Sequence, residues 1–298
     1  MKTSKHISLW AKLALFSAAL IWGSSFIVMK DSVDAFPPNI LLGIRFTTAT
    51  LLLCAIFFKR LKAFNRQYLL HGGVIGLCLF LAYCTQTIGL TGTTPGKNAF
   101  LTAVYCVLVP FLMWIFYKAR PDIFHFAAAV LCITGIGLVA LDGDFTMGYG
   151  DALTLVGGFF YAMHMITVAR FSQDKDPVLL TITQFGFVAA FSWAAGLIFE
   201  TFPTEFPLHS LGGVLYLAVF ATAVCLLLQN VGQKYTSPAS TAILLSLESV
   251  FGVLFSVLFY DEPLSPRLIA GFALIFVAVI VSETKLSFLF KKKPVPKA

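Results

Sequence analysis

The stretch QTIGLTGTTP at residues 86–95 returns in the second half of the chain as QNVGQKYTSP at residues 229–238. The two stretches share a glutamine, a glycine, a threonine and a proline, which common hydrophobicity alone would not select. The match continues in the same register through Ala99/Ala242, Leu101/Leu244, Val107/Val250, Phe116/Phe259 and Tyr117/Tyr260. Such an internal repeat indicates two related halves, which we place at residues 1–142 and 143–298.

The composition is that of a membrane protein. The chain has 298 residues, of which 58% are hydrophobic and 12% charged, with a mean hydropathy of +0.87. A soluble domain carries about 25% charged residues, so this chain has too few polar side chains to cover a globule in water. In a membrane protein, the positions of the Lys and Arg residues along the chain are more informative than the net charge of +7. We therefore expect no nucleic-acid partner. None of the six cysteines has metal-site spacing, so we expect no metal or cofactor.

Ten apolar runs are long enough to cross a bilayer, whose core of about 30 Å needs roughly 20 helical residues. The gaps between the runs are short, which leaves no room for a soluble catalytic domain. Each half of the chain holds five of these runs. The predicted spans are Leu9–Met29, Asn39–Phe58, Tyr68–Leu90, Asn98–Tyr117, Ile123–Leu141, Asp151–Ala169, Val178–Phe199, Leu208–Val231, Ala239–Tyr260 and Pro266–Ser282.

The Lys and Arg residues predict the orientation of these spans. With the N-terminus in the cytoplasm, seventeen of the 21 Lys and Arg residues fall on the cytoplasmic side. Only Lys30, Lys97 and Arg267 fall outside, and Arg45 lies within a span. We therefore expect both termini in the cytoplasm and a multi-pass location in the cytoplasmic membrane.

An odd number of spans in each half means that the second half enters the membrane from the opposite side. A slightly different register aligns the earlier spans, with Pro38 opposite Pro177 and Arg45 opposite Gln184. We predict an all-α membrane protein with ten transmembrane helices in two inverted five-helix repeats. Inverted repeats are typical of secondary transporters, whose substrate site lies at the repeat interface near the bilayer midplane. Rocking one half against the other would open such a site to each side in turn.

Several short motifs resemble one known family. They are Ile21-Trp22-Gly23-Ser24-Ser25-Phe26, Arg45-Phe46, Thr93-Thr94-Pro95, Ser237-Pro238-Ala239, Leu247-Glu248-Ser249-Val250-Phe251, and Tyr260-Asp261-Glu262-Pro263-Leu264 followed by Gly271. Together they resemble the EamA-type ten-helix branch of the drug/metabolite transporter superfamily, although Ser249 stands where that family has a proline. The resemblance covers essentially the whole chain. It implies a carrier of amino acids, nucleobase-like compounds or other metabolites.

Ionisable residues inside a membrane span are costly and usually face a cavity or a partner. Glu248 lies near the middle of its span, where it could bind an amine, take up a coupling proton, or brace two helices. Its repeat equivalent Tyr105 is expected to face the same cavity. Arg45 could attract a substrate carboxylate or bond backbone carbonyls at helix ends. His164 could relay protons or bind substrate, or it could be a packed neutral side chain.

The remaining candidates are polar or aromatic residues that could line a small-molecule site. Gln86 and Gln229 are repeat equivalents, and Tyr83 lies one turn from Gln86; interhelical hydrogen bonding is the alternative for these residues. Trp22 and Tyr161 are also equivalent and could stack on the substrate or simply pack. Asn98 lies beside the helix start at Thr94-Pro95, which could guide an anion or be ordinarily capped.

We predict a secondary transporter that exports a small polar or amphipathic metabolite, such as an amino acid, by alternating access. An importer of a vitamin or nucleoside-like compound with the same fold is the alternative. An intramembrane enzyme is a remote alternative, because no nucleophile–base pair, metal cluster or paired-carboxylate motif is present, and we predict no enzymatic activity. The expected partners are the small-molecule substrate, membrane lipid and, if Glu248 couples transport, protons. The active unit would be a monomer or a homodimer.

Overall fold

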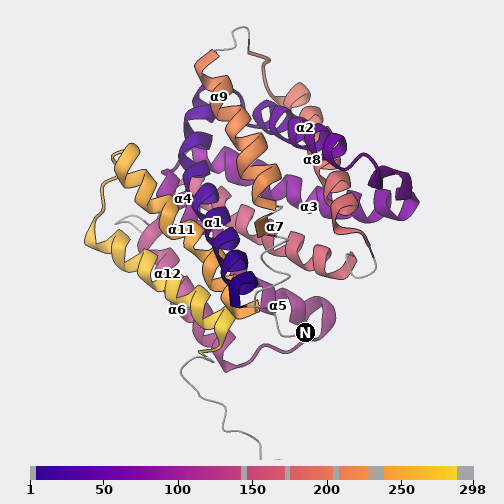
Figure 1. Ribbon diagram of the computed structural model, residues 1–298. Coiled ribbons are helices and arrows are strands. Elements are labelled where there is room, and N and C mark those ends of the chain that lie inside the picture. Colours follow the sequence, from indigo (N-terminus) through magenta and orange to yellow (C-terminus); the bar gives the residue numbers. More distant parts are fainter. Residues whose placement is uncertain are drawn as a thin grey trace, which may run out of the picture.

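The structure, a computed structural model, describes residues 5–141, 146–171, 175–203, 208–226, 228–229 and 238–286. These residues are almost entirely helical, and they contain one isolated β-bridge, between Leu141 and Met147. The elements, shown in Figure 1, are α1 (Lys5–Ala35), α2 (Pro38–Ile56), the 3₁₀ helix η1 (Arg60–Ala63), α3 (Arg66–Thr91), α4 (Pro95–Thr102), α5 (Tyr105–Tyr117), α6 (Ile123–Ala140), α7 (Tyr149–Phe171), α8 (Pro177–Phe199), α9 (Leu208–Tyr216), the π-helix η2 (Leu217–Val224), α11 (Pro238–Phe259) and α12 (Pro266–Thr284).

The predicted membrane spans are confirmed. Within the described residues, eight helical segments are long and apolar enough to cross a bilayer, and Pro95–Tyr117 counts as one of them. Two shorter apolar helices, Ser210–Val224 and Leu244–Phe259, complete the ten. Large apolar side chains on the outer surface, such as Ile133 and Leu197, are exposed, as lipid-facing residues are. The motif residue Ser237 and the repeat positions Gly232 and Thr236 lie outside the described residues.

Helix ends follow the local sequence. Asn65, Thr94 and Ser265 each accept backbone N–H groups with their side chains at the start of α3, α4 and α12. Proline opens α2, α4, α8 and α12, where its missing N–H has no intrahelical partner to lose. These caps position the loops that join one span to the next.

Equivalent helices of the two repeats pack against each other in antiparallel fashion. The start of α2 meets the end of α8, because a Cβ on Gly196 would lie 2.9 Å from Cγ1 of Ile40. Further along α2, Trp193 Nε1 donates to Thr47 Oγ1 over 3.0 Å. The pair α6 and α12, side by side in Figure 1, likewise joins the end of one helix to the start of the other. Equivalent helices that run in opposite directions are what inverted repeats require.

We call α2/α8 and α6/α12 the axial pairs, because each contributes the same span from both repeats. The larger apolar core surrounds α2 and α8, and a second core lies between α5, α6 and α12. The remaining spans pack across the repeats, with α3 on α7 and α1 on α11. The placement of both termini in the cytoplasm stays a prediction from the Lys and Arg distribution.

Two spans depart from regular α-helix. The fourth span is interrupted at residues 103–104, so α4 is separate from α5, although one continuous run was predicted. The eighth span widens into the π-helix η2, in which Thr222 Oγ1 donates to the carbonyl of Leu217. Irregular turns inside membrane helices often mark functional positions. Both of these contribute side chains to the cavity described next.

Candidate functional site

A cavity of about 570 Å³ lies between the helices of the two repeats. All ten residues selected from the sequence line it, namely Trp22, Arg45, Tyr83, Gln86, Asn98, Tyr105, Tyr161, His164, Gln229 and Glu248. Asn230, the neighbour of Gln229, lies outside the described residues. The walls are mostly apolar and aromatic with a few polar groups, the usual make-up of a small-molecule site.

The repeat symmetry explains why these residues converge. Several equivalent pairs line the cavity, so it must lie on the axis that relates the repeats. They include Trp22/Tyr161, Arg45/Gln184, Gln86/Gln229 and Tyr105/Glu248. The pairs are symmetric in position but not in chemistry, because each charged member faces a neutral equivalent. The cavity therefore carries one cationic and one anionic side chain from these pairs.

Glu248 on α11 faces its repeat equivalent directly. The hydroxyl of Tyr105 donates to Glu248 Oε1 over 3.3 Å. Tyr105 is the first residue of α5, immediately after the interruption of the fourth span. Among the described residues this long hydrogen bond is the one polar contact of the carboxylate, and it leaves most of the carboxylate's acceptor capacity unused. Glu248 can therefore accept further hydrogen bonds from a ligand.

Arg45 is buried on α2, with 2% of its surface exposed. Its Nε donates to Thr222 Oγ1 on η2 over 2.9 Å, and its guanidinium carbon lies 4.8 Å from the centre of the Tyr83 ring. Among the described residues, neither Nη atom has a hydrogen-bond partner and no carboxylate forms a salt bridge with Arg45. The guanidinium thus reaches a hydroxyl inside the protein, not backbone carbonyls at a helix end.

Gln86 is held at both ends of its amide. Its Nε2 donates to Thr102 Oγ1 over 2.8 Å, and its Oε1 accepts from the hydroxyl of Tyr161 over 2.8 Å. The Tyr161 ring meets the Tyr83 ring edge to face, with centroids 5.4 Å apart. Gln86 therefore ties α3 to α4 and α7 on the cavity wall, and a ligand would have to compete with these bonds.

His164 and Trp22 also have partners across the cavity. His164 Nε2 lies 2.8 Å from Gln184 Oε1, which joins α7 to α8. Trp22 Nε1 donates to the carbonyl of Ala221 over 2.7 Å, in the π-helix η2. The indole is thereby fixed with its ring against the cavity, where it can offer an apolar face to a ligand.

Asn98 is completely buried on α4. Its Nδ2 donates to Thr154 Oγ1 over 2.8 Å and to the carbonyl of Gln86 over 3.3 Å. Its Oδ1 has no partner among the described residues, and the same is true of the buried hydroxyl of Thr87 on the same cavity. Buried polar atoms normally have a partner, so these two oxygens are unsatisfied groups at the closed end of the cavity.

The N-terminus of α4, considered above as an anion site, is already occupied. The backbone N–H of Gly96 donates to Glu262 Oε2 over 3.0 Å, and Thr94 accepts the N–H of Lys97 as an ordinary cap. Because a carboxylate of the protein takes this place, the partial positive charge of the helix end is satisfied internally.

Several polar residues of the cavity are not among the predicted ones. Gln184 is predicted only as the position opposite Arg45, and Thr102 and Thr222 carry hydroxyls, which are common in membrane helices. Glu283 lies one residue beyond the predicted end of the last span, at Ser282. The repeat alignment could have found Gln184, because the equivalents of cavity residues should line the same cavity.

The chain matches the model of the EamA-like transporter family over residues 9–141 and again over residues 148–284. An "Uncharacterized transporter" of Archaeoglobus fulgidus is 34% identical over 278 residues, which cover 93% of this chain and 87% of the relative. The "Uncharacterized inner membrane transporter YedA" of Escherichia coli K12 is 27% identical, with 95% and 93% covered.

A solved structure titled "Crystal structure of protein" has the same fold, with a TM-score of 0.66. Its sequence is 19% identical, and the match covers 92% of this chain and 98% of that one. The family match spans nearly the whole chain in two copies, and the described helices include ten apolar spans. The chain belongs to the EamA-like transporter family and is a multi-pass transporter of the plasma membrane.

Proposed function

We propose that this protein is a secondary carrier that exports a small zwitterionic or amphipathic metabolite, such as an amino acid, by alternating access. The observation that carries the proposal is the presence of Arg45 and Glu248 in one cavity on the repeat axis, without a salt bridge between them in the described structure. The carrier would consist of the repeats 1–142 and 143–298.

The two charges support a ligand that carries both signs. A buried charge is costly unless it is paired, and neither Arg45 nor Glu248 has an ionic partner among the described residues. A ligand carboxylate would satisfy the free Nη atoms of Arg45, and a ligand ammonium would satisfy Glu248. The orphan oxygens of Asn98 and Thr87 could accept further donors from the ligand. The aromatic wall would cover its apolar part.

The size of the cavity supports a small substrate. A volume of about 570 Å³ falls within the range of ligand pockets, roughly 300–1,000 Å³. Such a volume accommodates an amino acid with a large side chain or a similar metabolite.

The direction of transport is inferred from the end at which the cavity is accessible. Glu283 and Met165, toward the C-terminal ends of α12 and α7, are exposed lining residues, whereas Asn98 at the other end is fully buried. With both termini in the cytoplasm, the accessible end would face the cytoplasm, which suits loading from inside. An importer would use the same site, so direction needs a transport assay in oriented vesicles.

Ligand binding to the purified protein tests the substrate class. We expect one or more amino acids to raise the melting temperature of the wild-type protein, because binding stabilises the folded state. Arg45→Gln and Glu248→Gln should each weaken binding on the order of tenfold or more, as loss of a charged hydrogen bond implies. Arg60→Gln, which removes a half-exposed arginine outside the cavity, is the matched control. Equal binding by Arg45→Gln and Arg60→Gln would refute the proposed site.

Proton coupling through Glu248 is a separate hypothesis, motivated by its position on the cavity. If Glu248 carries the coupling proton, transport by the wild-type protein depends on pH and transport by Glu248→Gln does not. Uptake into proteoliposomes across a pH series measures this difference. An unchanged pH dependence in Glu248→Gln would end the hypothesis without affecting the substrate class.

A further inference from the structure

The cavity is closed at the face where α1 and α3 end and where α4, α7 and α12 begin, which we call the gate face. Leu90 and Asn98 are buried there, and Lys30 Nζ donates to the carbonyl of Leu90 over 2.9 Å. The backbones of α3 and α7 are in contact, because a Cβ on Gly150 would lie 2.4 Å from the carbonyl carbon of Gly92. Opening this face must separate helices that now touch.

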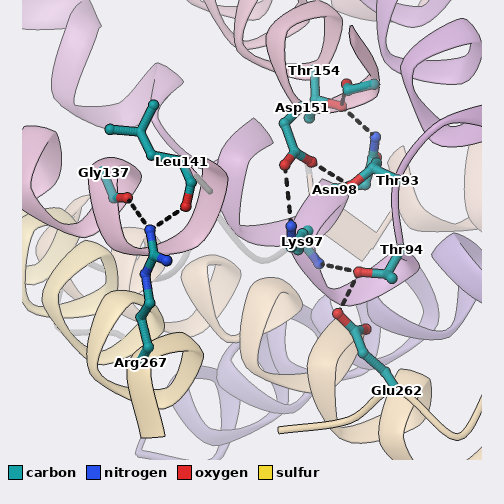
Figure 2. Close-up of polar contacts among 11 residues, drawn as sticks. Thr93, Thr94, Lys97, Asn98, Gly137, Leu141, Asp151, Thr154, Glu262 and Arg267 are labelled. Carbon is teal, nitrogen blue, oxygen red and sulfur yellow. Dashed lines mark hydrogen bonds and ion pairs between the residues drawn. The ribbon is translucent and has the colours of Figure 1, made fainter. Parts of the chain in front are cut away.

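Glu262, in the turn between α11 and α12, fastens the start of α4. Its carboxylate accepts from the hydroxyl of Thr94 (Figure 2). It accepts from the backbone N–H of Gly96 over 3.0 Å. It also accepts from the hydroxyl of Ser256 on α11. The residue is only 4% exposed. One buried carboxylate thus holds the first turn of α4 against the second repeat.

A second carboxylate fastens the other side of the same turn. Asp151, near the start of α7, accepts from Thr93 and lies 3.2 Å from Lys97 Nζ (Figure 2). One turn further along α4, Asn98 donates to Thr154 of α7. The short helix is therefore attached to α7 on one side and to the α11–α12 turn on the other.

α4 is separated from the rest of its span by a break in the helix. It ends at Thr102, and the interruption at residues 103–104 separates it from α5. Asn98 and Thr102 of α4 line the cavity, so this helix forms part of the cavity wall at the closed end. Release of its first turn would uncover the cavity at the gate face, with the interruption as a hinge.

At the opposite face, the sequence has no acidic residues at the positions equivalent to Glu262 and Asp151. The repeat register that pairs Gln86 with Gln229 places Ala119 opposite Glu262 and Ser240 opposite Lys97. The register of the earlier spans, which pairs Pro38 with Pro177, places Lys12 opposite Asp151. Neither carboxylate has an acidic counterpart, although Lys118 and Asp261, one residue before Ala119 and Glu262, share the same left-handed backbone conformation. The two faces are similar in backbone here but not in the groups that would hold them shut.

From this asymmetry we infer that Glu262 is a positioning residue for transport, which holds α4 as a gate and keeps the substrate-free carrier closed at the gate face. The inference rests on the proposed alternating access. Opening the gate face requires the buried carboxylate to give up its bonds to Thr94 and Gly96. The sequence supplies no acidic equivalent of Glu262 or Asp151 to hold the opposite face shut, so the resting carrier stays accessible there.

The test is one-sided labelling of a cysteine at the closed end of the cavity. All six native cysteines are replaced, and Thr87→Cys is introduced because its hydroxyl has no partner in the described structure. A membrane-impermeant maleimide is applied from each side of oriented vesicles without ligand. The parent should be labelled mainly from the side opposite the gate face. Glu262→Ala should raise labelling from the gate face on the order of tenfold, as loss of hydrogen bonds to a charged group implies.

Two further variants separate the gate from general damage. Thr94→Val removes the hydrogen bond from the Thr94 hydroxyl to Glu262 but keeps the bond from the backbone N–H of Gly96. It should therefore raise gate-face labelling less than Glu262→Ala. Glu200→Ala removes a carboxylate that caps α2 on the same face, where it accepts the N–H groups of Asn39 and Ile40 away from the cavity. Its labelling should match that of the parent. If Glu262→Ala does not fold, the comparison of Thr94→Val with Glu200→Ala decides.

Parent-like labelling of folded Glu262→Ala, or an equal rise in Glu200→Ala, would overturn the gate. Because the labelling needs no ligand, its result is distinguishable from failure of the proposed substrate class. A protein that binds no amino acid but shows the Glu262-dependent rise would lose the proposed substrate and keep the gate. A protein that binds its ligand but shows no rise would keep the substrate and lose the gate.

Discussion

The axial pairs and the fourth span differ in the continuity of their helices and in how the ends of those helices are held. At one end of the pair α2/α8, Asn39 Nδ2 of α2 donates to Glu200 Oε1, just after α8. At the other end, Arg60 Nη1, in the 3₁₀ helix that follows α2, lies 2.9 Å from Asp176 Oδ2, in the residue before α8. The pair α6/α12 is tied at one end by Arg267, which donates to Leu141, and at the other by the residues discussed below. The fourth span is broken, and its first piece is fastened at the gate face.

Proline adds to this difference. Pro110 lies inside α5, where it removes the N–H that would bond to the carbonyl of Cys106, and Ser282 Oγ donates to that carbonyl instead over 3.4 Å. Its repeat equivalent in α11 is Val253, and α11 runs unbroken from Pro238 to Phe259. Two spans of common origin therefore differ in continuity. One is an unbroken helix, and the other is interrupted at residues 103–104 and carries a proline in its second piece.

The largest expected effect comes from placing in α11 the proline that α5 carries at the equivalent position. Val253→Pro would remove a helical hydrogen bond from α11 and clash with the preceding turn, which costs about 3 kcal/mol or more. Thermal unfolding in detergent should show a much lower melting temperature than for Val253→Ala, the control for loss of the side chain. Equal melting temperatures of Val253→Pro and Val253→Ala would show that α11 tolerates an internal proline as α5 does.

A smaller effect is expected from separating an axial pair. A Cβ on Gly271 would lie 2.6 Å from Cγ2 of Val139 and 3.0 Å from the carbonyl oxygen of Gly135. Gly271→Leu should therefore overpack α6 against α12 and cost about 1–3 kcal/mol of unfolding free energy. Gly212→Leu is the control, because a Cβ on Gly212 would meet nothing within 4 Å. Equal melting of the two variants would contradict close packing of this pair.

The smallest effect is expected at the remaining tie of α6/α12. Lys285 Nζ lies 2.6 Å from Asp122 Oδ2, outside the spans. Partial burial acts to raise the pKa of Asp122, but the hydrogen bonds from Lys285 and from the backbone of His125, together with the charges of both residues, outweigh it, and the pKa lies below its ordinary value. A carboxyl group with a lowered pKa stabilises the folded state above its ordinary pKa, and this contribution is lost as pH falls through the lowered value.

Asp122→Asn should therefore melt slightly below the wild-type protein at neutral pH and lose part of the acid dependence of the melting temperature. The effect stays small because the pair is partly exposed and screened. Measurements at low and high salt provide the control, since screening should shrink the difference. If the melting temperature of Asp122→Asn depends on acidic pH as that of the wild-type protein does, the ion pair of Asp122 with Lys285 does not stabilise this helix pair.

The sequence predicted the spans, the two related halves and ten residues that line the cavity, because lipid imposes a length and a polarity that leave few alternatives. It could not predict the break after Thr102, since residues 103–104 contain neither glycine nor proline. The role of Glu262 was equally hidden. Its partner Thr94 lies in the other half of the chain, and no local pattern marks such a contact. The internal bonding of Gln86 likewise depends on the packing of three helices.

The ties at both ends of the axial pairs have a consequence for the moving parts. Each pair takes one helix from each half of the chain, so a rigid swing of one half against the other would shear both pairs. The boundary between the two duplicated halves thus runs through contacts that hold both ends of these helix pairs together. In the proposed alternating access, the moving units would therefore differ from the duplicated halves, and single segments such as α4 would move against the axial pairs.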